Sequence, residues 1–288
     1  MADDSGVTIR ELWSQTTDVI GARHEARWLC EVATSLDGED FIVALDEQAT
    51  ERMVAHLDAM VARYREGEPL QYVLGRWSFR RLDLAIDRRV LIPRPETELV
   101  AEVAIELARA VAPPRVVADL GTGSGAIGLS LAVELPLDGT TVWITDKSEA
   151  ALAVASANVT GIGRPARNVR VAAGSWFEAL PAGERFDVIV SNPPYVADGS
   201  PDLEPSVAEW EPVEALLAGP DGLDAIRVLV EGAGKHLKDN GWLVLEIGAD
   251  QGQAVRALYE RAGFREIEIR QDLAGRDRIA LGQSMNGA

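Results

Sequence analysis

Residues 116–128 read Val-Val-Ala-Asp-Leu-Gly-Thr-Gly-Ser-Gly-Ala-Ile-Gly, and the prediction of the whole fold depends on this stretch. The apolar run predicts a buried strand. The glycines after it permit a sharp turn, which brings backbone N–H groups against a ligand at the start of a helix. The last six residues also match the dinucleotide-binding pattern G-x-G-x-x-G. The turn therefore predicts a nucleotide-type binding site, and a nicotinamide enzyme is one candidate.

Helix and strand patterns alternate around this turn. Strands are predicted at 116–120, 141–145, 169–173, 186–190 and 242–247. Helices are predicted at about 96–110, 126–135, 148–159, 223–237 and 251–262. Two final strands, near 265–270 and 277–282, have no helix between them. The pattern predicts an α/β fold with a doubly wound parallel sheet and an antiparallel hairpin at one edge.

The chain before this α/β region has a different pattern. Residues 8–65 carry three apolar stripes at helical spacing, which predict a small helical bundle. From about Trp77 to Ile92 apolar and polar residues alternate, which predicts a β-hairpin. We therefore expect an N-terminal helical domain at 1–75, a hairpin linker at 76–95 and an α/β domain at 96–288.

Composition excludes several classes of protein. The chain has 288 residues, of which 47% are hydrophobic, so it is not a disordered protein. No apolar stretch is long enough for a membrane span, and the acidic N-terminus is unlike a signal peptide. Cys30 is the single cysteine, and the three histidines lack metal-ligand spacing. We expect a cytoplasmic protein without disulfides or metal ions.

The net charge is strongly negative. The sequence has 28 Lys and Arg against 46 Asp and Glu, a formal charge of −18. Such a surface repels nucleic acid phosphates and suits a basic protein partner. Solubility alone, or an acidic bias of the lineage, explains the same charge.

Two acidic residues bear on the choice of cofactor. Asp146 ends the second predicted strand, 21 residues after Gly125, where a carboxylate receives ribose hydroxyls. Asp146-Lys-Ser-Glu149 also has the form of a helix cap. Asp119 lies beside the glycine turn, where an anion disfavours a pyrophosphate and attracts the amino and sulfonium charges of S-adenosylmethionine.

Asn192-Pro193-Pro194-Tyr195 follows the fourth predicted strand. A planar nitrogen, in an amide or a base amine, is methylated only when it is held in line with the methyl group and its N–H groups donate hydrogen bonds. An Asn side-chain oxygen and a backbone carbonyl oxygen can accept these hydrogen bonds. The prolines stiffen the loop, and the Tyr ring offers a flat wall against which the planar methyl acceptor can pack. The alternative is a proline-rich turn without chemistry.

The glycine turn and the Asn192–Tyr195 loop should face each other, because the carboxyl ends of parallel strands open onto one crevice. Trp176 follows the third strand, where adenine would lie. A core aromatic residue is an equally good interpretation of Trp176.

Taken together, these motifs resemble the class I S-adenosylmethionine-dependent amino-methyltransferases. Four further segments make the chain similar to the HemK/PrmC-type peptide chain release factor glutamine methyltransferases: 68–75, 91–98, 174–177 and 211–216. The resemblance runs from about residue 65 to the C-terminus and fits the short N-terminal domain. It implies a seven-stranded methyltransferase sheet.

The resemblance also implies the reaction and the site. The reaction is methyl transfer from S-adenosylmethionine to the side-chain amide nitrogen (N5) of the glutamine in the Gly-Gly-Gln motif of class 1 release factors, in translation termination. The cofactor residues would be Asp119, Gly121, Thr122, Gly123, Ser124, Gly125, Asp146, Trp176 and Asn192. The glutamine would be held by Asn192, Pro193, Pro194 and Tyr195, with Asn192, Pro193 and Tyr195 acting in catalysis. The bundle and hairpin would recognise the release factor.

Three rival functions stay open. A ribosomal-protein glutamine methyltransferase shares most of these motifs. A nucleic-acid adenine or cytosine amino-methyltransferase shares the Asn192–Tyr195 motif but requires a basic target-recognition segment, which the sequence does not contain. A scaffold that binds the cofactor without turnover is also conceivable, although its acceptor loop would then have no use.

Overall fold

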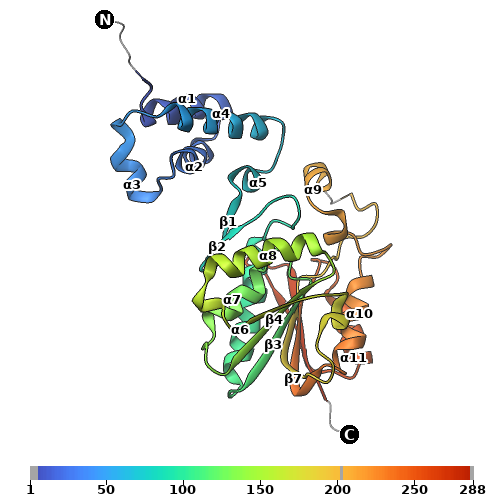
Figure 1. Cartoon of the computed structure of the whole chain (residues 1–288). Coiled ribbons are helices and arrows are strands. Elements are labelled where there is room, and N and C mark those ends of the chain that lie inside the picture. The colour runs from blue at the N-terminus through green and yellow to red at the C-terminus, as the bar shows by residue number, and fades with distance from the viewer. Residues whose placement is uncertain (1–5, 202–203, 286–288) are drawn as a thin grey trace, which may run out of the picture. The chain divides into compact units, whose positions relative to one another are not determined.

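The computed structural model describes residues 6–201 and 204–285, which divide into two compact units, Met1–Arg76 and Trp77–Ala288 (Figure 1). Over these described residues, no helix combines the length and apolar character that crossing a bilayer requires. The same residues contain no group of three or more His, Cys, Asp or Glu side chains arranged to hold a metal ion.

The first unit is helical. Its helices are α1 (Ile9–Ile20), α2 (Arg23–Thr34), α3 (Gly38–Val43), η1 (Ala44–Asp46), α4 (Glu51–Arg65) and α5 (Leu70–Leu74). The apolar faces of α1, α2 and α4 meet in one core that includes Leu12, Leu29, Phe41, Leu57 and Met60. The three predicted stripes are therefore helices. The sequence did not predict α3 and α5, because helices of six and five residues are too short to show a periodic stripe.

The hairpin is shorter than predicted. It consists of β1 (Arg76–Phe79) and β2 (Leu82–Ala85), joined by a two-residue turn. Val90 and Ile92 are buried but lie in a loop, so the prediction of strand up to Ile92 was wrong. Asp87 starts a turn there by accepting hydrogen bonds from the backbone N–H groups of Val90 and Arg89. In this loop Val90 and Ile92 are buried and Leu91 between them is less buried, so burial alternates as it would in a strand.

The second unit is built on a seven-stranded sheet with the order β5-β4-β3-β6-β7-β9-β8. The first five strands in this order are parallel, and β9 and β8 run antiparallel at one edge. The strands are β3 (Arg115–Leu120), β4 (Thr140–Asp146), β5 (Val169–Ala173), β6 (Phe186–Ser191), β7 (Leu237–Glu246), β8 (Arg265–Gln271) and β9 (Asp277–Gln283). The predicted doubly wound sheet with its antiparallel edge hairpin is confirmed.

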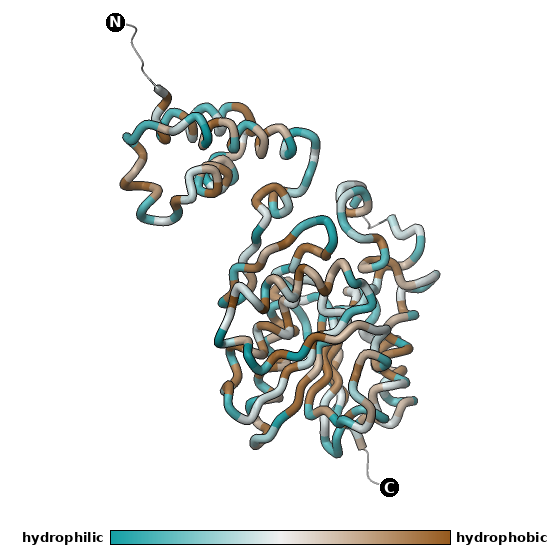
Figure 2. Tube along the Cα trace, viewed as in Figure 1, coloured by the Kyte–Doolittle hydropathy of each residue, from teal (hydrophilic) through white to brown (hydrophobic). Residues whose placement is uncertain are grey.

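Helices cover both faces of this sheet: α6 and α7 pack on one face, and α10 and α11 on the other (Figure 1). The helices of this unit are α6 (Pro95–Ala110), α7 (Ala126–Glu134), α8 (Glu149–Ile162), α9 (Pro205–Trp210), α10 (Asp224–Ala233) and α11 (Gly252–Arg261). Short 3-10 helices occur at η2 (Arg164–Ala166), η3 (Trp176–Ala179) and η4 (Val213–Ala215). Apolar residues concentrate along the central strands, where the sheet is buried on both sides (Figure 2).

The boundary between α10 and β7 differs from the prediction. Helix α10 ends at Ala233, and β7 already begins at Leu237, five residues before the predicted strand. The first part of β7 carries the polar run Lys238-Asp-Asn-Gly241, and Asn240 has a φ of 64°. The pairing with β6 shifts register there, from Phe186↔Leu237 to Val188↔Trp242. A bulged, polar strand start shows no alternation that a sequence pattern could detect.

Candidate functional site

A cavity opens at the carboxyl edge of the parallel strands of the second unit. Its wall combines the loop after β3 with the loops after β4, β5 and β6, at Asp146, Trp176 and Asn192. Its rim consists of residues from 89–93 and 212–215, which flank α6 and α9 in the sequence. The predicted site residues in the wall are Asp119, Gly121, Thr122, Gly123, Ser124, Asp146, Trp176, Asn192 and Pro194. Gly125, Pro193 and Tyr195 lie outside it.

The glycine loop has backbone conformations that side chains rarely adopt. Gly121, Gly123 and Gly125 have φ values of 72°, 55° and 90°. A Cβ at Gly121 would also approach the ring of Trp176 to 3.2 Å. Gly125 is the N-cap of α7, so the loop ends at the positive end of a helix. Glycine is needed here both for the turn and for close approach of a ligand.

Asp119 is an unusual member of the cavity wall, because its side chain is buried and incompletely paired. Its Oδ2 accepts hydrogen bonds from Thr122 Oγ1 at 2.5 Å and from the Gly128 N–H at 2.8 Å. Its Oδ1 has no hydrogen-bond partner among the described residues. Burial raises the pKa of the carboxyl to about 6. The free oxygen is an acceptor for a donor or cation that enters the cavity.

Asp146 braces the glycine loop. Its Oδ2 accepts from the Gly123 N–H at 3.0 Å, and its Oδ1 accepts from the Ser148 N–H at 2.9 Å. The N-cap of α8 is Ser148, whose hydroxyl accepts from the Ala151 N–H. The capping interpretation of Asp146 is therefore wrong in detail. Asp146 lies two residues before the cap and ties it to the loop after β3.

Trp176 contacts both the cavity and the core. It lines the cavity next to Gly121, and it packs against the main hydrophobic cluster of the second unit. Its φ of 48° is in the left-handed region. The two interpretations given above, a ligand contact and a core aromatic residue, are thus compatible with each other.

The acceptor loop begins where β6 ends. Ser191 donates a hydrogen bond to the Leu120 carbonyl oxygen at 2.6 Å, which ties the end of β6 to the end of β3. Asn192 Nδ2 donates to Thr97 Oγ1 at 3.2 Å. Because this contact uses the side-chain nitrogen of Asn192, its side-chain oxygen, Oδ1, remains available to accept a hydrogen bond. Asn192 itself lines the cavity.

Tyr195 lies in the acceptor loop but behind the cavity wall. Its ring packs against the main core, and its hydroxyl donates to Glu246 Oε1 at 3.1 Å. Burial raises the pKa of Tyr195 well above its usual value. Gln251 Nε2 donates to the Tyr195 carbonyl oxygen at 3.0 Å and to that of Gly222 at 3.2 Å. This placement anchors the loop and keeps the ring out of the cavity lining.

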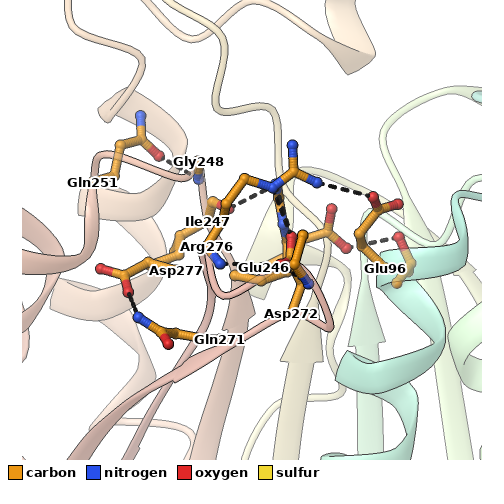
Figure 3. A network of polar contacts seen from close by, with 12 residues as sticks. Glu96, Glu246, Ile247, Gly248, Gln251, Gln271, Asp272, Arg276 and Asp277 are labelled. Carbon is orange, nitrogen blue, oxygen red and sulfur yellow. Dashed lines mark hydrogen bonds and ion pairs between the residues drawn. The ribbon is translucent and has the colours of Figure 1, made fainter.

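The sequence did not single out Thr97, which lines the cavity, nor Glu246 and Arg278, which lie behind it. Glu246 ends β7, has 1% of its surface exposed, and has a pKa raised to about 6 by burial. Figure 3 shows the polar contacts around it, including Arg276, which reaches from the β8–β9 turn to Glu96 of α6. Thr97 does lie within the 91–98 motif. For Glu246 and Arg278 the available signal was a charge within an apolar strand.

The rim is held together by an ion pair whose carboxylate is buried and whose guanidinium is partly exposed. Glu211 accepts a hydrogen bond from the Ile92 N–H at 3.0 Å and pairs with the Arg94 guanidinium. The guanidinium of Arg88 stacks 4.0 Å from the centre of the Trp210 ring. These contacts join two segments, 88–94 and 210–211, that are more than a hundred residues apart. Residues of the 91–98 motif therefore contact a residue of the 211–216 motif directly, so the two motifs form one structural unit.

Comparisons with known proteins agree with this architecture. The family model described as Methyltransferase small domain matches residues 102–209, and that described as PrmC N-terminal domain matches residues 15–75. Release factor glutamine methyltransferase of Xylella fastidiosa is 47% identical over 225 residues, covering 78% of this chain and 80% of that protein. The protein of the same name from Gloeobacter violaceus is 41% identical over 263 residues, which is 89% of each chain.

Among solved structures, a 16S rRNA methyltransferase of T. thermophilus in complex with AdoMet and guanosine gives a TM-score of 0.52 at 19% identity. The match covers 73% of this chain and 49% of that chain. At this identity the similarity concerns the fold alone.

The buried carboxyl of Asp119 yields a prediction for stability. Its raised pKa means that the folded protein keeps this proton between about pH 4 and 6 while the unfolded chain has lost it, so folding stability falls as pH rises through this window. Asp119→Asn removes the charge and can keep both accepted hydrogen bonds. We expect the variant to flatten this pH dependence and to gain about 1–3 kcal/mol at pH 7.

The measurement is denaturant unfolding of ligand-free protein from pH 4 to 8. Asp119→Ala is the control, because it removes the charge but leaves Thr122 and Gly128 without their acceptor, and it should destabilise. An Asn variant that is less stable at pH 7 and keeps the wild-type slope would contradict the assignment.

Proposed function

This chain belongs to the release factor glutamine methyltransferase family, and on that premise we propose that it methylates the side-chain amide nitrogen (N5) of the glutamine in the Gly-Gly-Gln motif of class 1 release factors. The observation that carries the proposal is the cavity, which brings the glycine loop and the Asn192–Tyr195 loop to one crevice. One loop is suited to a methyl donor and the other to an amide.

S-adenosylmethionine is the proposed methyl donor, and when bound it supplies an electrophilic methyl group on a positively charged sulfur. The free Oδ1 of Asp119 fits a cationic amino group. In the loop 121–125 the N–H groups of Gly121, Thr122, Gly123 and Gly125 already donate within the protein, which leaves that of Ser124 for a ligand. A dinucleotide is disfavoured, because its pyrophosphate would meet the Asp119 carboxylate at this turn.

Asp146 and Trp176 complete the proposed cofactor site. The Asp146 carboxylate would accept ribose hydroxyls, although each of its oxygens already accepts one backbone hydrogen bond. Carboxylate oxygens have a second lone pair, so the two functions are compatible. Trp176 would pack on the adenine side of the cavity.

Asn192 is the proposed acceptor for the glutamine amide. Its Oδ1 and a backbone carbonyl oxygen of the same loop would each accept a hydrogen bond from one N–H of the glutamine, holding the nitrogen in line with the methyl group. In this loop Pro194 lines the cavity and Pro193 does not. Proline at 193 and 194 stiffens this loop. For Tyr195 the observed contacts support an anchoring role through Glu246 and Gln251 in place of a flat wall.

Membership of the family favours release factors over the rival substrates. The PrmC N-terminal domain matched at 15–75 supports recognition by the first unit. The charge of −18 argues against nucleic acid. Purified enzyme with labelled S-adenosylmethionine should be offered release factor, ribosomal protein and DNA separately, followed by mass spectrometry of the glutamine-loop peptide. Label in ribosomal protein or DNA alone would replace the proposal with a rival.

We expect Asn192→Ala to abolish most methyl transfer and to retain much of the cofactor affinity. The lost oxygen leaves the substrate N–H unpaired and the nitrogen misaligned, and one positioned hydrogen bond of this kind typically accounts for ~10²–10³ in rate. Single-turnover kinetics at saturating cofactor measure the effect. Wild-type turnover by this variant would end the role of Asn192.

Asp146→Ala is expected to weaken cofactor binding more than it lowers the rate at saturating cofactor. The carboxylate lies away from the transferring group and contributes uniform binding. Asp146→Asn is the matched control, since its oxygen can still brace the Gly123 N–H. Calorimetric titration decides: an unchanged dissociation constant in the Ala variant would leave Asp146 a purely structural role.

Removal of residues 1–75 should leave a folded chain that binds cofactor, because the second unit has its own sheet and covering helices. Methylation of intact release factor should fall steeply, while methylation of a short glutamine peptide should persist. If docking is partly electrostatic, salt should weaken only the full-length reaction. Equal losses on both substrates would indicate damage to the second unit, and full retention on the intact factor would refute docking by the first.

A further inference from the structure

The geometry behind the acceptor loop points to a role that rests on the proposed function. We infer that Glu246 and Thr97 are positioning residues that fix the orientation of the Asn192 amide, and that they thereby select a glutamine side chain over a glutamate. Glu246 lies behind the cavity wall and acts only through Thr97, whereas Thr97 lines the cavity and acts on Asn192. The selection is set by which end of the Asn192 amide faces the cavity.

The three side chains form a continuous chain of hydrogen bonds. Thr97 Oγ1 lies 2.7 Å from Glu246 Oε2 and 3.2 Å from Asn192 Nδ2. Thr97 is in the first turn of α6, Glu246 ends β7, and Asn192 follows β6, so three separate elements converge. Thr97 and Glu246 are buried, with 3% and 1% of their surface exposed. Water cannot easily replace either partner at this depth.

The direction of these bonds follows from the donor inventory. A carboxylate can only accept, so the single hydroxyl proton of Thr97 is committed to Glu246. Thr97 can then offer only a lone pair to Asn192, which must present its NH₂ group. The side-chain oxygen of Asn192 consequently points away from Thr97 and toward the position of the glutamine amide, which accepts the methyl group. Without Glu246, Thr97 could donate to Asn192 and the amide would be free to turn over.

The surroundings keep Glu246 available as an acceptor. Its other oxygen, Oε1, accepts from the Tyr195 hydroxyl at 3.1 Å. Arg278 on β9 lies behind this pair, with Nη1 3.4 Å from the Tyr195 hydroxyl, and its positive charge favours the ionised carboxyl. Glu96 on α6 opposes ionisation, but Arg276 pairs with Glu96 at 3.5 Å (Figure 3). With a pKa of about 6, Glu246 is mainly ionised at neutral pH.

This orientation distinguishes an amide from an isosteric acid. A glutamine can donate hydrogen bonds from its N–H groups to the Asn192 side-chain oxygen. An ionised glutamate has only oxygens, so two hydrogen-bond acceptors would face each other. A site built to accept hydrogen bonds rejects a ligand that cannot donate them. If the amide turned over, its NH₂ would instead favour the acid. The preference for glutamine should therefore depend on the Thr97 hydroxyl, although the group that meets the glutamine is the Asn192 amide.

The test compares Thr97→Val, which removes the hydroxyl at nearly constant volume, with Thr97→Ser, which keeps it. Wild-type enzyme must first methylate the release factor, and failure there would refute the proposed function instead of this inference. For Thr97→Val we expect kcat to fall about 10–100-fold, the scale for loss of a partner that orients a functional ligand. Thr97→Ser should restore most of it, and the cofactor dissociation constant should not change in either variant.

The decisive readout is binding of two peptides that differ only in glutamine or glutamate at the target position, measured by competition. The preference for the glutamine peptide should fall about tenfold in Thr97→Val and persist in Thr97→Ser. A loss of fold stability alone would weaken both peptides together. An unchanged preference in a folded Thr97→Val variant would overturn the inference.

Glu246→Gln provides an independent arm. A side-chain amide no longer obliges Thr97 to donate, so kcat and the peptide preference should both fall. In a Thr97→Val background the same substitution should add little, because Glu246 acts through Thr97. Additive losses in the double variant would mean that Glu246 affects the site by another route and would overturn the relay.

Discussion

The parallel pairing of β3 with β6 is the constraint on which the site depends. In this register Asp119 lies opposite Val190, so the glycine loop and the acceptor loop leave the sheet side by side although they are about 70 residues apart in the chain. The hydrogen bond from Ser191 to the Leu120 carbonyl oxygen fixes the two strand ends. A shift of this register by one residue would turn Asp119 to the opposite face of the sheet and separate the glycine loop from the acceptor loop.

Two buried carboxylates with raised pKa values lie at this edge, Asp119 in the cavity wall and Glu246 behind it, and both are tolerated at a cost to stability. Asp119 and Glu246 each have a pKa raised to about 6 because burial penalises the ionised form. Each also accepts two hydrogen bonds from the protein, which offset part of that cost. Asp119 lines the cavity and retains a free oxygen, whereas Glu246 commits one oxygen to Thr97 and the other to Tyr195. The first can therefore act on a ligand directly, and the second only through its neighbours.

The sequence predicted the sheet, its helices and most of the cavity wall because these depend on local patterns. Strand β3 and the glycine turn are contiguous, and so are β6 and Asn192. The parts that escaped prediction depend on contacts between distant segments. Tyr195 turns away from the cavity because Glu246 and Gln251 hold it from β7 and the start of α11. Val90 and Ile92 imitate a strand because a loop buries them, and no periodicity distinguishes the two cases.

The antiparallel hairpin at the sheet edge completes this arrangement. Strand β9 runs against β7, with Ile279 opposite Glu246, and the Ile247 N–H donates to the Arg278 carbonyl oxygen. This direction places Arg278 next to Tyr195 and Glu246, and it places Arg276, in the turn that precedes β9, next to Asp272 and Glu96. A parallel last strand would have needed a crossover helix and would have put a different end of the strand at this edge. The reversal of the sheet thus brings the Arg278 guanidinium near Glu246, and its charge favours the ionised carboxyl. The polar contacts behind the acceptor loop therefore include a residue of β9, a strand that contributes nothing to the cavity wall.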